Sequence, residues 1–262
     1  MFGEEDLDPE LERYHYESEN GWDVIKHPLV FSICHTPHQN KMVNQQLAYK
    51  KGAIRKALKE GEWHSYVFLH ERPFRVDAFK RIAKRMSDEQ YWDLLSECWI
   101  DSENIRENPT VWQGLLRSKR PGRENMMSYA DRELLVRFPE SIEVFQGHTD
   151  ERDDGWSWTI DRSKAEWFAR RFADFEHADP VLSFGVAHKK DVIAFLTNRG
   201  ESEILIPRSK VKICGVTPVR RNTTEASGGG AMVRHQSVAD AFQYINGTTS
   251  NTGFVQIDMG GL

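Results

Sequence analysis

The sequence contains few cysteines and no long apolar run. Its three cysteines, Cys34, Cys98 and Cys214, lie far apart in a chain of 262 residues. This distribution excludes the closely spaced framework of a small disulfide-rich domain and agrees with a reducing compartment. No apolar run approaches the roughly 18 residues that a membrane-spanning helix needs. The acidic N-terminus also lacks the basic and then apolar segments of a secretory signal peptide. We therefore expect a cytoplasmic protein that makes no contact with a membrane.

The charge of the chain is mild in total but unevenly distributed. The formal net charge is −5, and hydrophobic residues make up 39% of the chain, as in a globular protein. Residues 1–30 contain nine acidic residues against two basic, whereas residues 180–262 contain nine basic against six acidic. The basic end permits contact with an anionic ligand or with nucleic acid, but does not require it.

The pattern of apolar residues divides the chain into three regions. Residues 1–20 are acidic and poor in apolar side chains, which predicts a flexible tail. Residues 21–138 are expected to be mainly helical. Apolar residues recur at a helical period in 41–60 and again after Pro73, and Ser87–Gln90 forms a capping box at the start of another helix.

From residue 139 onward the pattern favours strands, and residues 139–262 are expected to form one core. Asp161 is expected to cap a helix within it. A tight turn at 189–191 separates two β-rich runs, a loop is predicted at 227–230, and a last helix at 238–245. The expected strands lie at 142–145, 157–160, 181–187, 192–196, 204–206 and 211–216.

Two carboxylates, Glu201 and Glu203, follow a turn signal and precede the apolar run 204–206. In an extended strand these two side chains point to the same face. Each raises the energy of the other's charge, so a fold usually tolerates such a pair where it meets a cation, a sugar or a reacting centre. The alternative is a solvated strand on which the two glutamates pair with Arg199 and Arg208.

Two earlier segments complete a pattern with this pair. The first is Val-Phe-Gln-Gly at 144–147. The second is Gly-Trp-Ser-Trp-Thr-Ile-Asp at 155–161, followed by an Ala-x-x-Phe-Ala helix at 165–169. In order and spacing, the segments of 142–216 resemble the ADP-ribosyltransferases of the Arg-Ser-Glu type, which cleave NAD at its nicotinamide bond. The resemblance implies an α+β fold, with a helical N-terminal region packed on a split, mixed β-sheet core that binds NAD.

The resemblance also implies roles for individual residues. Glu203 would stabilise the positive charge that develops on the ribose and bond its 2′-hydroxyl, and Ser157 would hold the Glu203 carboxylate. Glu201 would orient or deprotonate the acceptor. The residues expected to contact NAD are Gln146, Gly147, His148, Arg152, Ser157, Trp158 and Thr159.

One position departs from the family pattern. The arginine that ends the first strand and helps hold the NAD phosphates is Gln146 here, and glutamine brings no charge. Arg152, His148 or Arg162 could supply the cation instead. A catalytically silent binding module therefore stays open as an alternative, as does an NAD glycohydrolase that uses water as acceptor.

The implied partners follow from the same resemblance. The acceptor is expected to be a protein arginine or a nucleic-acid base. The setting resembles bacterial or phage toxins and effectors, which need a restraining antitoxin or inhibitor protein. Cys34, His35 and His38 invite a zinc interpretation, but no second ligand pair follows them, so we expect no metal site.

Overall fold

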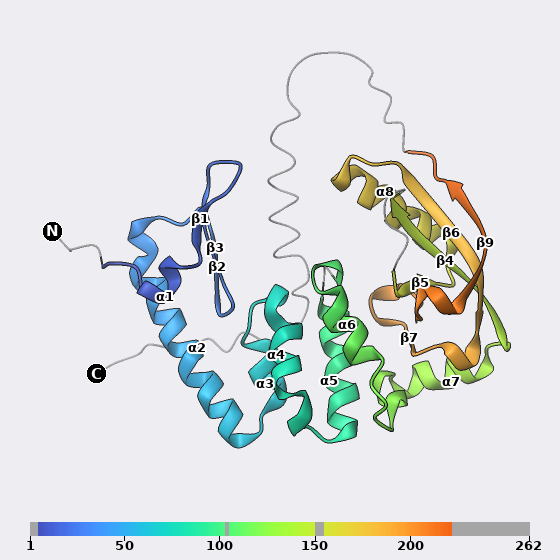
Figure 1. The fold of residues 1–262 in the computed structure, drawn as a ribbon, viewed down its shortest axis with the longest axis horizontal. Helices are drawn as coiled ribbons and strands as arrows, with labels where there is room; N and C mark the ends of the chain where they lie inside the picture. Colours follow the sequence, from blue (N-terminus) through green and yellow to red (C-terminus); the bar gives the residue numbers. More distant parts are fainter. Residues whose placement is uncertain (1–4, 103–104, 150–154, 222–262) are drawn as a thin grey trace, which may run out of the picture. The chain divides into compact units, whose positions relative to one another are not determined.

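The computed structural model describes residues 5–102, 105–149 and 155–221 (Figure 1). The described residues belong to one compact unit. The C-terminal boundary of the core expected at 139–262 stays a prediction. The predicted loop at 227–230 and helix at 238–245 lie outside the described residues. Within the described ranges, no helix is both long and apolar enough to cross a membrane.

Helices dominate the chain before residue 138 and strands dominate after it. The α-helices are α1 Pro9–Glu12, α2 Asn40–Glu60, α3 Trp63–Phe68, α4 Arg75–Ile82, α5 Asp88–Asp101, α6 Pro109–Leu116, α7 Tyr129–Arg137 and α8 Arg162–Glu176. The strands are β1 His15–Glu17, β2 Asp23–His27, β3 Val30–Ile33, β4 Ser141–Thr149, β5 Ser157–Thr159, β6 Pro180–His188, β7 Ala194–Leu196, β8 Glu203–Leu205 and β9 Val211–Pro218.

Local capping residues start the two helices that matter most for the candidate site. At α5, the Ser87 hydroxyl accepts the Gln90 N–H at 3.2 Å and the Gln90 side chain accepts the Ser87 N–H at 3.1 Å. This confirms the predicted capping box. At α8, the Asp161 carboxylate accepts the backbone N–H groups of Ser163 and Lys164 at 2.9 and 3.2 Å, as predicted for that N-cap.

The described part of the acidic N-terminal segment, for which the sequence predicts a flexible tail, contains α1 and β1. Strand β1 pairs with β2, and β2 with β3, in a small antiparallel sheet. Leu11 of α1 is fully buried in a hydrophobic cluster with Ile25, Val30 and two residues of α2. Leu7, which is partly buried, packs against the same cluster, and the cluster removes these apolar side chains from water. The sheet also means that region 21–138 is not purely helical.

The second sheet has six strands in the order β7-β8-β5-β4-β6-β9. Every described pairing in it is antiparallel, so the expected mixed sheet is wrong, whereas the coarser α+β class is confirmed. Strands β6 and β7 are consecutive but do not pair. Strand β6 lies between β4 and β9, and β7 pairs with β8.

Helix α8 packs closely on the sheet at one glycine. A Cβ atom at Gly147 of β4 would lie 1.9 Å from the carbonyl oxygen of Ala165 and 2.6 Å from the backbone nitrogen of Ala169. Both alanines are fully buried. Gly147 therefore has a packing role, because only a residue without a side chain lets the helix backbone approach this strand.

We expect Gly147→Ala to destabilise the protein by at least about 1–3 kcal/mol, the usual cost of overpacking a core. Urea unfolding measures the change. Gly114→Ala on α6 is the matched control, because nothing lies within 4 Å of its Cβ position, and alanine in a helix is favoured over glycine by up to about 1 kcal/mol. Equal stability of the two variants would contradict the close approach of α8.

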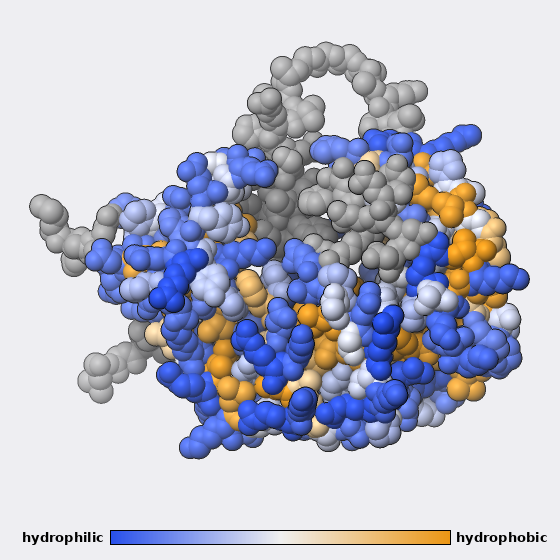
Figure 2. All heavy atoms as spheres, viewed as in Figure 1, coloured by the Kyte–Doolittle hydropathy of each residue, from blue (hydrophilic) through white to orange (hydrophobic). Residues whose placement is uncertain are grey.

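The helical region and the sheet share one hydrophobic core. The largest buried cluster joins residues of α3 to α6, among them Trp92 and Trp99, to sheet residues that include Trp158 and Ile204. On the face drawn in Figure 2, hydrophilic residues cover most of the described surface, with smaller hydrophobic areas between them. The helices are thus part of the structure that supports the sheet, which places α5 within reach of the candidate site.

Candidate functional site

The three sequence segments that carry the resemblance lie on neighbouring strands. Gln146 is on β4, Ser157 begins β5, and Glu203 begins β8. Strand β5 pairs with β4 on one side and with β8 on the other. The fold therefore brings together residues that are 11 to 57 positions apart in the chain.

The two glutamates do not share a strand. The chain turns at Asn198–Gly200, Glu201 has helical backbone angles, and Ser202 has a φ of +47°. Strand β8 begins only at Glu203. The alternation argument for this pair is therefore wrong, because the strand begins two residues later than the sequence pattern indicates. A non-glycine residue in the left-handed region is strained, and such strain clusters at functional sites.

Thr159 holds the turn that carries Glu201. Its hydroxyl donates to the Glu201 carbonyl oxygen at 2.8 Å and accepts the Asp161 N–H at 3.0 Å. Thr159 also lies directly opposite Glu203 in the ladder between β5 and β8. Thr159, which the sequence predicts to contact NAD, thus positions the backbone between Glu201 and Glu203.

The ladder places Ser157 and Glu203 on one face of the sheet. Paired residues of antiparallel strands share a face, and Thr159 pairs with both Glu203 and Phe145. Ser157 lies two residues before Thr159 and pairs with Leu205, two residues after Glu203, so Ser157 and Glu203 lie on that same face. Gln146 follows Phe145 in β4, so it points to the opposite face. The hydrogen bond predicted between Ser157 and Glu203 stays a prediction.

Gln146 is buried and engaged with backbone. Its side-chain N–H donates to the Ser157 carbonyl oxygen at 2.9 Å, and a Cβ atom at Gly155 would lie 2.0 Å from the Gln146 amide nitrogen. Its Oε1 atom is buried without a hydrogen-bond partner in the described structure. The glutamine therefore fixes the start of β5 rather than facing the carboxylate of Glu203.

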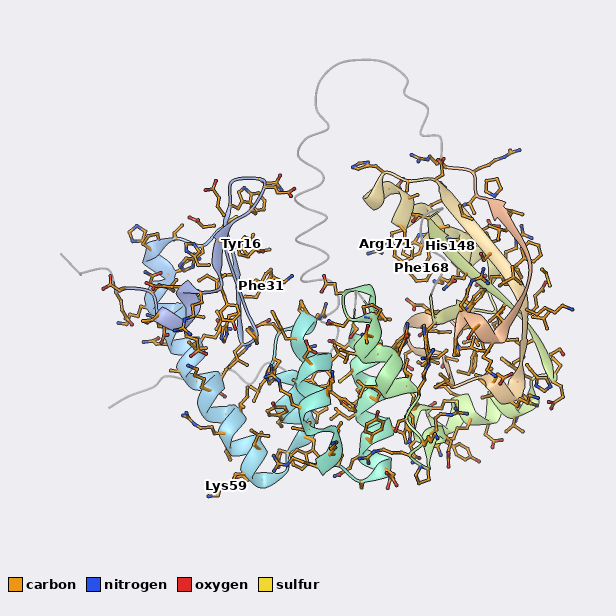
Figure 3. The ribbon with its side chains drawn as sticks, in the orientation of Figure 1. Tyr16, Phe31, Lys59, His148, Phe168 and Arg171 are labelled. Carbon is orange, nitrogen blue, oxygen red and sulfur yellow. The ribbon has the colours of Figure 1, made fainter. Side chains whose placement is uncertain are left out.

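The other predicted NAD contacts differ in position. His148 of β4, labelled in Figure 3, is buried, and its two ring nitrogens lie 2.6 Å from the Thr149 carbonyl oxygen and 2.8 Å from the Ser183 hydroxyl. Trp158 is a core residue, 1% exposed. Arg152 lies outside the described residues. Among the described members of the predicted set, these observations leave the exposed Ser157 and the half-buried Glu201 and Glu203 accessible.

The principal residue that the sequence analysis missed is Trp99 of α5. Its indole N–H lies 3.1 Å and 3.2 Å from the two carboxylate oxygens of Glu203. Trp99 is buried and packs edge to face on Trp112, with ring centroids 5.2 Å apart. A buried indole needs an acceptor, but nothing in the sequence identifies a partner 104 residues away.

A groove borders the turn that precedes Glu203. It is lined by Ser202, by Ile160 and Asp161 after β5, and by the first residues of α8. Arg162 lies there and pairs with Glu166 at 3.0 Å. The Ser163 hydroxyl donates to Asp161 and lowers the pKa of that carboxyl. The described lining of the groove thus carries one guanidinium, of Arg162, and two carboxylates, of Asp161 and Glu166.

The cysteine and histidine segment near residue 35 is a structural feature. The His35 ring is buried and bonded to the Asn40 side chain at 2.8 Å, and Cys34 is exposed with a φ of +56°. Across the described residues, no group of three or more histidine, cysteine or carboxylate side chains could hold a metal ion.

Comparison with known proteins adds no assignment to this geometry. No protein-family model matches the chain, and neither the curated proteins nor the solved structures include a significant match.

Proposed function

We propose that the protein is a mono-ADP-ribosyltransferase that moves ADP-ribose from NAD to a macromolecular acceptor and releases nicotinamide. The observation that carries the proposal is the carboxylate of Glu203, held by the Trp99 N–H on the same face as Ser157 and beside the turn of Glu201. The three motif segments lie on adjacent strands, which supports the resemblance from which the roles are taken.

The residue types suit the chemistry. The nicotinamide–ribose bond breaks with its electron pair leaving on nicotinamide, and positive charge develops on the ribose carbon. A fixed carboxylate stabilises that charge, which is the role of Glu203. The acceptor nucleophile then bonds the same carbon and loses a proton, for which Glu201 is the base.

The diphosphate of NAD fits this set of residues less well. Gln146 is neutral, buried and turned to the other face. We assign the role of the missing cation to Arg162 in the groove beside Ser202. Because Arg162 also pairs with Glu166, NAD has to compete for it, and this predicts weak binding of NAD in the absence of acceptor.

Two alternatives each rest on one feature. The buried Gln146 favours a silent binding module, because the first strand offers no charge to the substrate. Hydrolysis of NAD by water needs Glu203 but no acceptor. The setting we propose is cytoplasmic, in agreement with the three free cysteines, and a toxin-like activity would call for an inhibitor protein.

Label transfer tests the proposal. NAD labelled in its adenylate half is incubated with the full-length protein and cell extract, and the products are digested with protease or with nuclease. A label that becomes acid-precipitable and is then released by one of the two enzymes supports transfer and identifies the acceptor class. Free ADP-ribose without labelled macromolecules would favour the hydrolase, and unchanged NAD would favour the binding module.

A further inference from the structure

The segment Arg117–Arg123 carries four cations in seven residues, and three of them project from the surface. Arg117, Lys119 and Arg123 are exposed, and none has a carboxylate partner within the described part of the chain. We call these seven residues the cationic loop. Unpaired cations gathered on one short segment attract anions and give up little when they bind them.

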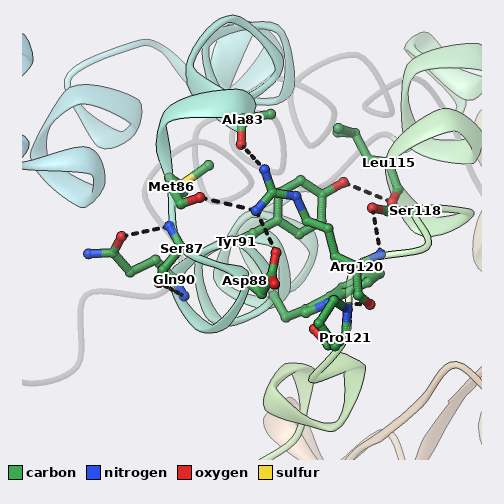
Figure 4. A network of polar contacts seen from close by, with 11 residues as sticks. Ala83, Met86, Ser87, Asp88, Gln90, Tyr91, Leu115, Ser118, Arg120 and Pro121 are labelled. Atoms are coloured by element: carbon green, nitrogen blue, oxygen red, sulfur yellow. Dashed lines mark hydrogen bonds and ion pairs between the residues drawn. The ribbon is translucent and has the colours of Figure 1, made fainter.

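The fourth cation, Arg120, fixes the loop to residues 83–88 of the helical region (Figure 4). The Arg120 guanidinium donates to the carbonyl oxygens of Ala83 and Met86 at 2.9 and 3.1 Å and pairs with Asp88 at 2.9 Å, and it lies over the Tyr91 ring. Five donors in a rigid fork suit this task. Arg120 therefore acts as an internal anchor and not as part of the exposed surface.

Buried donors also hold the backbone of the loop. The Trp92 indole lies 3.0 Å from the Pro121 carbonyl oxygen and 3.3 Å from that of Arg120, and the Tyr91 hydroxyl donates to the Leu115 carbonyl oxygen at 2.9 Å. A loop fixed in this way loses little entropy when it binds a ligand. The backbone that carries the three exposed cations is thus preorganised.

The loop borders a groove and the candidate site. The groove is lined by residues 118–123 of the loop, by Glu124 and Met127, and by Val192 and Ile193. The exposed Lys190 precedes this pair by two residues. On the other side, the Arg117 guanidinium lies 5.4 Å from the centre of the Trp156 ring, and Trp156 immediately precedes Ser157. An anion on the loop would therefore lie next to the strand that carries Ser157.

We propose that the cationic loop docks a single-stranded nucleic acid, which would be the acceptor of the proposed transfer. Cations beside a half-buried aromatic ring are the combination that binds a phosphate backbone and stacks its bases. An acidic peptide offers charge but no base to stack on Trp156 or on the guanidinium of Arg117. The role of the nucleic acid as acceptor rests on the proposed function, whereas its docking on the cationic loop does not require NAD.

Direct binding tests the docking without NAD. A fluorescent single-stranded RNA of about 16 nucleotides is titrated with the full-length protein at several salt concentrations. We expect Arg117→Gln/Lys119→Gln/Arg123→Gln to weaken binding about tenfold or more. The slope of log affinity against log salt should become about 2 shallower, since three phosphate contacts are lost.

The control removes the same charges from other elements. Arg55→Gln/Lys59→Gln/Arg81→Gln replaces two arginines and one lysine that are also exposed, with Lys59 near the end of α2 (Figure 3). This variant should bind like the wild type. Equal losses in both triple variants, no binding by the wild type, or competition by poly-glutamate that matches competition by unlabelled RNA would each overturn the proposal.

Nicotinamide release is measured on the same samples to separate the two hypotheses. Loop-dependent RNA binding with no NAD turnover would leave the docking surface intact and reject the transferase. NAD turnover together with RNA binding that is unchanged in the loop variant would support the transferase and reject the docking surface. Transfer of label to RNA by the wild type, lost in the loop variant but not in the control, would support both.

Discussion

Glu203→Gln is expected to lower nicotinamide release from NAD by about 10²- to 10³-fold, the loss typical of removing one preorganised electrostatic group from an active site. Glutamine has the same shape and keeps an oxygen that can accept the Trp99 N–H, so the fold should persist. It has no negative charge to place beside the developing ribose cation. The rate constant at saturating NAD is the quantity to measure, because the charge acts in the transition state.

The matched control is Glu143→Gln on β4. Glu143 is an exposed glutamate of the same sheet, and its replacement should leave nicotinamide release unchanged. Thermal unfolding of both variants checks that the sheet is intact. Retention of more than about half of the wild-type rate by Glu203→Gln would reject Glu203 as the residue that stabilises the ribose cation.

Trp99→Phe is expected to lower the same rate by about ten- to a hundredfold. The change removes the indole N–H that reaches both oxygens of Glu203, at 3.1 and 3.2 Å, while a ring remains to pack on Trp112. A hydrogen bond to a charged group contributes about 1.5–3 kcal/mol. This energy corresponds to the expected loss of rate if the whole contribution stabilises the transition state. Trp99 is a positioning residue, so kcat should fall more than KM rises.

Two further variants separate positioning from general stability. Trp112→Phe replaces the indole that packs on Trp99 with a smaller ring. Trp112 is buried, with 2% of its surface exposed, and its replacement leaves the Trp99 N–H donor in place. It should lower the free energy of unfolding with little effect on kcat. In the Glu203→Gln background, Trp99→Phe should cost almost nothing more, because the carboxylate it orients is gone. Additive losses would show that Trp99 acts through the fold alone.

Local signals predicted much of the secondary structure. The capping box at Ser87 and the N-cap at Asp161 involve residues within three positions of each other, so the sequence alone contains the whole interaction. The strand runs near 142, 157 and 204 were also visible, because apolar β-forming residues stand next to turn signals. These elements carry the three segments of the candidate site.

Long-range packing decided the features that the sequence did not predict. The acidic segment near Leu11 is ordered by a cluster with α2, and β6 pairs with β4 although β7 is nearer in sequence. The bond between Trp99 and Glu203 spans 104 residues. Such contacts depend on how elements pack in three dimensions, and hydrophobic periodicity carries no information about partners.

Backbone conformation accounts for the error at the two glutamates. The sequence pattern predicts a strand through Glu201, but the positive φ of Ser202 ends the turn just before Glu203. Thr159 fixes that turn through the Glu201 carbonyl oxygen. A single strained residue therefore separates the two carboxylates into different backbone settings, which agrees with different roles for them.

Nicotinamide release by the wild-type protein is the measurement that tests the central claim most directly. NAD is incubated with the full-length protein, with and without cell extract, and free nicotinamide is quantified over time beside the Glu203→Gln variant. The account predicts release by the wild type that extract accelerates and that Glu203→Gln lowers by about 10²- to 10³-fold. No release by the wild type under either condition would contradict the claim that this sheet carries an ADP-ribosyltransferase site.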